Sequence, residues 1–386
     1  MSDHAPPPAR PLGAVAQAGM FAFGIVMALV GAVVPALSQQ LAFTLADVGT
    51  LFLVMNFTML STSLVLGLVM DRFGLKPPLA AGAALVGVAL VLIGSADRFA
   101  DLVLGVLCLG AGGGAVNGSS NTLVADLHED PARKAAALNL LGVFFGIGAL
   151  FLPFSLGALT SALGMSGVLY AAAALCLLTS AVAAALRFPA PKQRQGLPFA
   201  QMAQFVRVPF VLALGCLLFF QSGNEFALGG YISSFLTHEL QLPIAAASYG
   251  LAAYWASIMV ARLVLSRLLL RLRPPLVVLG SAIVSAAGAL LIATATVPAQ
   301  AIAGVIVTGL ALAGIFPTVL GVAGARHAEH SGTVFGILFT IALSGGMTIP
   351  WAAGHLAEAA GLRWVFVLVA GNFAAVGALM MVARGK

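Results

Sequence analysis

The sequence predicts an all-α membrane protein with twelve transmembrane helices arranged as two related six-helix bundles. Its composition supports this fold class, since 61% of the 386 residues are hydrophobic and only 8% are charged. A soluble domain carries about a quarter of its residues as Asp, Glu, Lys and Arg, so a soluble fold is excluded. The 44 glycines agree with this reading, because small residues let transmembrane helices approach each other closely in lipid.

Twelve apolar segments are each long enough, at about 20 residues, to cross a bilayer. They span residues 11–37, 46–68, 78–96, 99–126, 134–160, 164–186, 209–237, 245–271, 274–295, 297–325, 330–357 and 361–383. Residues 1–10 have no apolar core and are expected to form a disordered cytoplasmic tail. The proline-containing linker 187–208 separates an N-terminal bundle, residues 11–186, from a C-terminal bundle, residues 209–386.

A charged turn, GLVMDRFGLKPP at residues 67–78, lies between the second and third spans. Charged side chains are costly in hydrocarbon, and Gly and Pro favour tight turns, so this segment is expected at a membrane surface. If both termini are cytoplasmic, only Arg98 and Arg363 of the 18 lysines and arginines lie outside. This asymmetry predicts that the turn and both termini face the cytoplasm.

An internal repeat relates the two halves of the chain. A shift of about 200 residues superposes polar and small positions of the fourth span on the tenth: Gly114, Asn117, Asn121 and Asp126 on Gly314, Pro317, Gly321 and Arg326. Pro153 of the fifth span likewise falls near Pro350 of the eleventh. Two copies of a six-helix unit are therefore expected.

The charged turn resembles the G-x-L-x-D-R-x-G-R-K loop between helices 2 and 3 of the major facilitator superfamily of transporters, and the resemblance covers nearly the whole chain. It implies alternating access, with a substrate bound between the halves near the midplane. It also implies that Asp71 meets the amino end of the eleventh span and that Arg72 pairs with Asp126, closing the cytoplasmic side. Leu75 departs from the motif, which has arginine there. In the alternative reading, Asp71 and Arg72 only solvate a turn.

Glu225 is the one acidic residue of twelve that lies in the middle of a span. An ionisable residue at that depth is costly and indicates a solute pathway or a proton site. Gln221 and Asn224 supply polar neighbours, and Gly229 and Gly230 could break the helix and form a gating hinge. The alternative is a structural glutamate that is bonded to neighbouring helices or paired with an arginine.

Arg262 lies in the eighth span, seven to eight residues after Tyr254 and Trp255. This spacing puts it about two helical turns from the midplane, which favours a role at the inner gate with the side chain extended toward the cytoplasmic interface. Two alternatives remain open, namely a pair with Glu225 and the binding of an anionic substrate.

Several amides are predicted to face the protein interior, because an amide in lipid must find partners. Asn117 and Asn121 lie four residues apart, on one face of the fourth span, and Asn56 lies in the second. Each could tie helices together or bind a polar solute. Together with Tyr254 and Trp255 they fit a sugar, whose hydroxyls need donors and acceptors and whose apolar face packs on an aromatic ring.

Residues 117–127 and 138–149 resemble the fucose and glucose permease branch of the superfamily. In that branch an aspartate in helix 1 and a glutamate in helix 4 are implicated in proton coupling and sugar binding. The corresponding positions here are Gly31 and Asn117, which cannot titrate. Proton coupling would therefore have to use Glu225, or the protein is a uniporter.

Other functions are weighed by the motifs that they need. Drug efflux would fit a pocket lined by Phe and Met, but Leu152 precedes Pro153 where antiporters have glycine, and no arginine lies within residues 102–110. A small organic anion would bind through Arg262. No P-loop or HExxH motif supports an enzyme. We expect a monomer in the inner membrane of a bacterium that contacts lipid, a small solute and a proton, and needs no cofactor, metal or nucleic acid.

Overall fold

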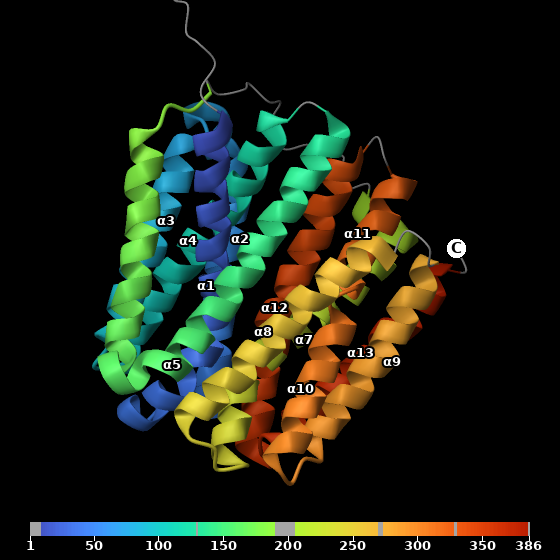
Figure 1. Ribbon diagram of the computed structural model, residues 1–386. Coiled ribbons are helices and arrows are strands. Elements are labelled where there is room, and N and C mark those ends of the chain that lie inside the picture. The colour runs from blue at the N-terminus through green and yellow to red at the C-terminus, as the bar shows by residue number, and fades with distance from the viewer. Residues whose placement is uncertain (1–8, 129, 190–204, 269–272, 328–329, 385–386) are drawn as a thin grey trace, which may run out of the picture. The chain divides into compact units, whose positions relative to one another are not determined.

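The computed structural model describes residues 9–128, 130–189, 205–268, 273–327 and 330–384. Within these ranges every regular element is helical and no strand occurs, which confirms the predicted all-α class (Figure 1). The chain forms two compact units. Unit 1 comprises Met1–Met27 and Phe57–Leu197, and unit 2 comprises Ala28–Asn56 and Pro198–Lys386. Most of the predicted tail and linker lies outside the described residues.

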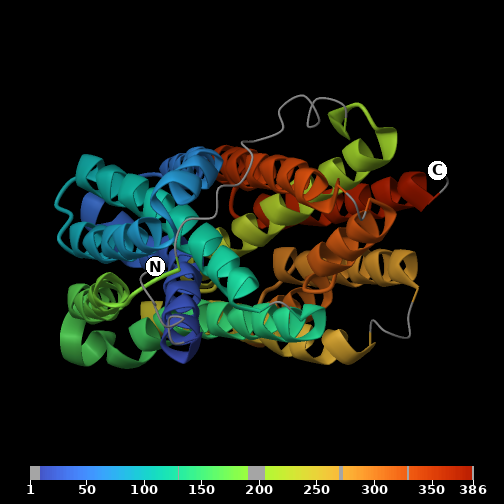
Figure 2. The ribbon, with the colours of Figure 1, turned by 90° about the horizontal axis from the view of Figure 1, so that it is seen from above.

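In the first half of the sequence the described residues form five helices: α1 (Ala9–Leu41), α2 (Leu45–Phe73), α3 (Lys76–Gly94), α4 (Phe99–Leu127) and α5 (Pro131–Ala185). Helix α5 is interrupted at Gly164, whose φ of 68° and ψ of 167° suit a residue without a Cβ. The chain reverses direction there, and the second arm of α5 runs back beside α3 (Figures 1 and 2). Two hydrogen bonds join these neighbours, from Ser166 Oγ to Gly94 O and from Ser180 Oγ to Ala80 O.

Where the structure describes the second half, the chain forms seven helical segments: α7 (Pro209–His238), α8 (Ile244–Leu268), α9 (Pro274–Ala293), α10 (Pro298–Leu312), α11 (Ile315–Arg326), α12 (Ser331–Ala360) and α13 (Arg363–Arg384). Helices α10 and α11 are two parts of one apolar span, separated by a turn at Ala313 and Gly314.

Eleven helical segments of the described residues are long and apolar enough to cross a membrane. One of them, Ala136–Ala185, contains the Gly164 turn, so its two arms correspond to the separately predicted spans 134–160 and 164–186. The largest difference from the predicted bounds is at α2, which continues to Phe73 instead of ending at residue 68. Its last turn is closed by a hydrogen bond from Gly74 N to Met70 O, and Gly74 has a φ of 80°.

The two units repeat one packing pattern. In unit 1, α3 packs against α4 and the second arm of α5, and in unit 2, α9 packs against α10 and α13. A second crossing recurs as well. Gly148 of α5 lies against the carbonyl oxygen of Phe21 on α1, and Gly345 of α12 lies against the carbonyl oxygen of Phe219 on α7, and a Cβ at either glycine would collide with that oxygen. These matched contacts agree with the internal repeat seen in the sequence.

Unit 2 includes parts of α1 and α2, residues Ala28–Asn56, which pack on helices from the second half of the chain. Gly31 of α1 touches the carbonyl of Gly229 on α7. Asn56 of α2 donates from Nδ2 to Gly346 O of α12, at 3.2 Å. The middle of α7 is therefore surrounded by protein, and all of Gln221 to Leu236 is buried.

Candidate functional site

Glu225 lies in the middle of α7 and faces α8. Its Oε1 is 3.7 Å from Nη2 of Arg262, and its Oε2 accepts a hydrogen bond from Gln221 Nε2 at 3.4 Å. Gln221 and Glu225 share a face because they lie four residues apart on one helix. The Arg262 guanidinium thus turns toward the buried carboxylate, which is one of the alternatives that the sequence left open.

Tyr254 and Trp255 of α8 are buried beside the same stretch of α7. The Tyr254 hydroxyl donates to the backbone carbonyl of Glu225 at 3.3 Å, and the two rings meet edge to face with centroids 5.2 Å apart. The Trp255 ring lies against Gly229. Tyr254 and Trp255 therefore pack α8 against α7 beside Glu225.

Asn224 points to α13 and away from the Glu225 carboxylate. Its Nδ2 donates to Val369 O at 3.2 Å, and its Oδ1 accepts from Asn372 Nδ2 at 2.9 Å. Adjacent residues on an α-helix diverge by about 100°, so Asn224 and Glu225 meet different neighbours. The expectation that Asn224 lines a cavity with Glu225 is not supported by this geometry. Asn372 was missed by the sequence reasoning, although an amide inside the apolar last span was a usable signal.

Gly229 and Gly230 do not break α7, which is a continuous helix from Pro209 to His238. The expectation of a broken helix at this pair is wrong. The glycines serve close packing, since Gly229 touches Gly31 of α1 and a Cβ at Gly230 would collide with the Phe52 ring of α2. This glycine pair thus allows neighbouring helices to pack closely and does not kink α7.

Asn56 and Gln221 each combine a bonded amide nitrogen with a buried amide oxygen. Asn56 Nδ2 donates to Phe52 O at 3.0 Å as well as to Gly346 O. Among the described residues, neither Asn56 Oδ1 nor Gln221 Oε1 has a hydrogen-bond partner. A buried acceptor without a donor is costly, so both oxygens are candidates to receive a hydroxyl or a water.

In unit 1, Asn117 and Asn121 lie on one face of α4, as their spacing predicts. Asn121 Nδ2 donates to the carbonyl oxygen of Asn117 at 2.9 Å and to its Oδ1 at 3.0 Å, and lies 3.7 Å from Met20 Sδ of α1. Both amides are half-buried. This pair is held mainly within its own helix.

The charged turn places Asp71 and Arg72 in the last turn of α2. Asp71 is half-buried, whereas Arg72 is exposed with its guanidinium 5.4 Å from the centroid of the Phe73 ring. Asp126 is half-buried in the last turn of α4. The pair between Arg72 and Asp126 and the contact of Asp71 with residues 331–332 remain predictions.

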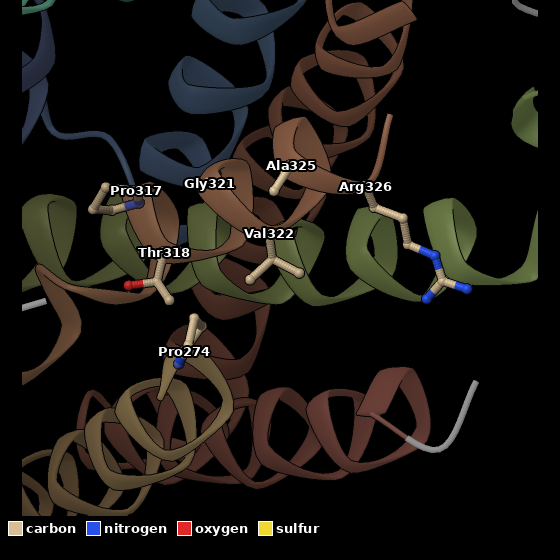
Figure 3. A pocket seen from close by; sticks show the side chains of 7 residues that line it. All are labelled: Pro274, Pro317, Thr318, Gly321, Val322, Ala325 and Arg326. Carbon is tan, nitrogen blue, oxygen red and sulfur yellow. The ribbon is translucent and has the colours of Figure 1, made fainter. Parts of the chain in front are cut away.

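Unit 2 also contains a crevice where α9 begins beside α11. It is lined by Pro274, Pro317, Thr318, Gly321, Val322, Ala325 and Arg326 (Figure 3). The Arg326 guanidinium lies 4.2 Å from the Phe210 ring centroid, near the start of α7. The crevice is mainly apolar and shares no residue with the group around Glu225.

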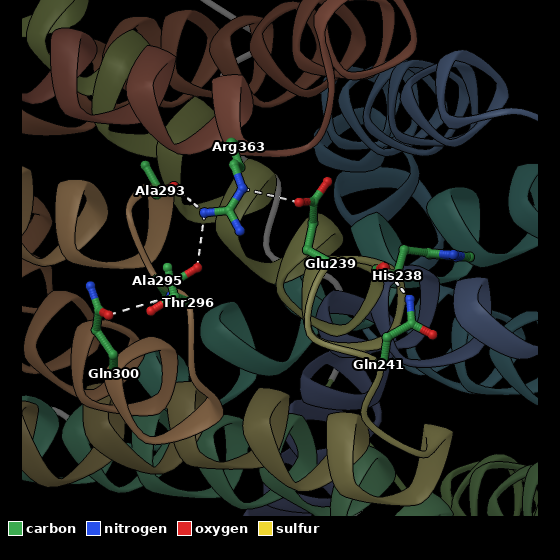
Figure 4. Close-up of polar contacts among 8 residues, drawn as sticks. All are labelled: His238, Glu239, Gln241, Ala293, Ala295, Thr296, Gln300 and Arg363. Atoms are coloured by element: carbon green, nitrogen blue, oxygen red, sulfur yellow. Dashed lines mark hydrogen bonds and ion pairs between the residues drawn. The ribbon is translucent and has the colours of Figure 1, made fainter.

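Arg363 forms a second ion pair in unit 2, partly exposed, where α7 and α9 end and α13 begins. Its Nε donates to Glu239 Oε2 at 3.0 Å, and its Nη1 donates to Ala293 O at 2.9 Å and Ala295 O at 2.8 Å (Figure 4). A guanidinium there satisfies carbonyls at the carboxyl end of α9. This arginine therefore joins three helix ends.

Repeated halves of apolar helices, one of which holds a buried glutamate at its middle, define a polytopic membrane protein. The sequence profile of the Major Facilitator Superfamily matches residues 18–223 and 214–385, and the chain belongs to this superfamily. The family resemblance drawn from the charged turn is thereby confirmed.

Solved structures share this fold along nearly the whole chain. The nucleoside transporter NupG superposes with a TM-score of 0.80 at 15% identity, covering 97% of this chain and 99% of NupG. The E. coli fucose:proton symporter FucP gives 0.67 at 17% identity, covering 96% and 98%. A bacterial homologue of the human lysosomal transporter Spinster gives 0.75 at 13% identity, covering 97% and 96%. A search of curated protein sequences gave no match.

Proposed function

We propose that this protein is a secondary carrier that moves a small hydroxyl-bearing solute, of sugar size, by alternating access and couples the movement to protons through Glu225. The observation that carries the proposal is the Glu225 carboxylate, buried in the middle of α7 and held by Arg262 and Gln221. A titratable side chain at that depth is expected on a solute or proton pathway. NupG and FucP, which share the fold, are named for a nucleoside and for fucose with a proton.

Solute contacts are proposed for groups that offer polar atoms or an apolar ring inside the helical bundles. Gln221 and Asn56 carry buried amide oxygens that would accept from solute hydroxyls. Trp255 would supply an apolar face for a ring. In unit 1, Asn117 and Asn121 offer amides on one face of α4. We leave Asn224 and Tyr254 out of the solute-binding group, because their polar atoms already bond α13 and the α7 backbone.

The side of the membrane is inferred from the arginines and lysines. Both termini and the charged turn of Asp71 and Arg72 would face the cytoplasm of a bacterium. There we propose that Asp71, Arg72 and Asp126 close the carrier toward the cytoplasm, and that Gly229 and Gly230, which pack against α1 and α2, belong to the opposite closure.

Transport by purified protein in proteoliposomes tests the coupling. Glu225→Gln should abolish accumulation driven by a pH gradient while counterflow exchange persists, because the amide fills the same space but cannot carry a proton. The matched control is Asp97→Asn, which removes an exposed carboxylate between α3 and α4 and should leave both activities unchanged. If accumulation driven by a pH gradient persists in Glu225→Gln, the proposed role of Glu225 in proton coupling is contradicted.

Thermal stabilisation by a panel of solutes tests the substrate class. Sugars and related hydroxylated solutes should raise the unfolding temperature of the purified protein. Stabilisation by lipophilic cations, without any by hydroxylated solutes, would instead favour a carrier for drug or lipid-like molecules.

A further inference from the structure

Pro350 leaves one carbonyl of α12 without a donor from its own helix. Proline has no backbone N–H, so the usual hydrogen bond from residue 350 to the carbonyl of Gly346 does not form. Asn56 of α2 supplies a donor instead, with its Nδ2 3.2 Å from that oxygen. The Asn56 side chain is fully buried, and its Nδ2 also donates to Phe52 O at 3.0 Å. An asparagine of one helix thus compensates for a proline of another.

The Asn56 bond lies at one end of a longer contact between α2 and α12. Gly49 packs against the backbone of α12, and Gly354 packs against the carbonyl oxygen of Leu45. Leu45, Gly49 and Asn56 share a helical face, because they are four and seven residues apart. We call this contact the α2–α12 seam, formed by residues 45–56 of α2 and residues 346–358 of α12.

Two hydrogen bonds across the seam differ in burial. The bond from Leu45 N to Glu358 Oε2, at 3.1 Å, is exposed to solvent, whereas the bond from Asn56 to Gly346 is buried. Water can replace an exposed partner, but a buried carbonyl that loses its donor is costly. If the seam opens, water can reach the Gly346 carbonyl. Asn56 is therefore needed as a donor only while the seam is closed.

The seam lies at the end of α2 that is opposite to the charged turn, since Leu45 begins this helix and Phe73 ends it. The sidedness proposed above places that end on the outer side of the membrane. We propose that the α2–α12 seam is the outer closure of the carrier and that Asn56 is its latch, a positioning residue that bonds the carbonyl left free by Pro350. This inference rests on the proposed carrier function and adds the gating of that carrier.

Two spin labels measure the opening of the seam without any solute. Gln40, near the end of α1 and shortly before α2 begins, and Ala359 of α12 are exposed and can carry the labels in a variant whose three cysteines are replaced by alanine. Double electron–electron resonance in lipid nanodiscs then gives the ratio of open to closed seam. Asn56→Leu should raise this ratio about 5-fold or more, because the closed seam then buries a carbonyl without a donor.

A second substitution restores the donor from α12 itself. Pro350→Ala gives residue 350 a backbone N–H for the Gly346 carbonyl, so in the Asn56→Leu background it should bring the ratio back toward the wild-type value. A role of Asn56 in packing alone predicts no such rescue. Pro153→Ala, at the corresponding proline of the repeat on α5, is the control and should leave the ratio of Asn56→Leu unchanged. Asn56→Ala serves in the same comparison if Asn56→Leu does not fold.

An unchanged ratio in Asn56→Leu, or a ratio that Pro350→Ala does not lower in that background, would overturn the latch. The coupling role of Glu225 is tested separately. If Asn56→Leu opens the seam but Glu225→Gln keeps its pH-driven accumulation, the coupling proposal fails and the latch stands. If Glu225→Gln loses that accumulation but Asn56→Leu leaves the seam closed, the latch fails and the coupling proposal stands.

Discussion

The crossing of α1 with α5 and the crossing of α7 with α12 share one glycine–carbonyl contact but differ in the side chains beside it. In each, a phenylalanine carbonyl lies against a glycine, Phe21 against Gly148 and Phe219 against Gly345. Six residues beyond the phenylalanine, α1 carries Met27 where α7 carries Glu225. The repeat thus supplies one scaffold twice, and the charged group is a feature of one copy. The close contact at both crossings uses a glycine and a backbone carbonyl, so it does not depend on the polar side chains of α7.

The largest expected effect tests whether the two crossings are equivalent. Gly148→Leu and Gly345→Leu should each destabilise the protein by about 3 kcal/mol, because a backbone carbonyl cannot move aside for the new side chain. Thermal unfolding in detergent measures this. Gly142→Leu on α5 and Gly336→Leu on α12 are the controls, since a Cβ there meets nothing within 4 Å. A large loss of stability in only one of Gly148→Leu and Gly345→Leu would show that the two crossings are not equivalent.

Removing one charge tests what α7 adds to the shared scaffold. Arg262→Gln should lower the free energy of unfolding by about 1–3 kcal/mol, less than for a fully buried pair because Arg262 is partly exposed. The double variant with Glu225→Gln should regain part of that loss, since no carboxylate is then left unpaired. At the matching position of α1, Met27→Leu should change stability by less than about 1.5 kcal/mol. Equal losses in the single and double variants would show that charge pairing is not the cause.

The amides linking α7 to α13 should contribute somewhat less. Asn372→Leu leaves Asn224 Oδ1 buried without its donor, which should cost about 1–2 kcal/mol. It should also reduce pH-driven uptake, because α7 is then held less firmly. Repeating the substitution in an Asn224→Leu background should cost less, and an unchanged cost there would mean that the amide pair does not act as a pair.

The smallest effect is expected at the amides of α4. Asn121→Leu removes hydrogen bonds that stay mostly within its own helix, so stability should change by less than about 1 kcal/mol. If Asn121 contacts solute, solute-induced thermal stabilisation should nevertheless fall. A stability loss as large as that of Asn372→Leu would instead assign Asn121 a helix-joining role.

The helices could be predicted from the sequence because spanning a bilayer needs long apolar runs, and even the Gly164 turn coincides with the start of a predicted span. The partners of each polar side chain could not. A transmembrane helix that is apolar all round has no polar stripe to show which neighbour each face meets. Glu225 was therefore found by its depth alone, and its pair with Arg262 stayed one alternative of several. The bonds of Asn224 to α13 could not be predicted.

Glycine was ambiguous for a related reason. A pair such as Gly229 and Gly230 can form a hinge. The absence of a side chain also allows Gly31 and Phe52 to pack closely against α7, and this is what the structure has. The end of α2 was placed too early because charged residues were assumed to lie outside the helix. Asp71 and Arg72 instead occupy its last turn, where side chains can reach water from a helical backbone.

Asn224 fixes the rotation of α7 about its own axis. Its two hydrogen bonds to Val369 and Asn372 hold one side of the helix against α13, and the next residue along the chain must then project about 100° away, toward Arg262. Any rotation of α7 about its own axis large enough to carry Glu225 to another helix would break both amide bonds. The direction in which the Glu225 carboxylate points is thus set by Asn224, an uncharged neighbour that does not contact it.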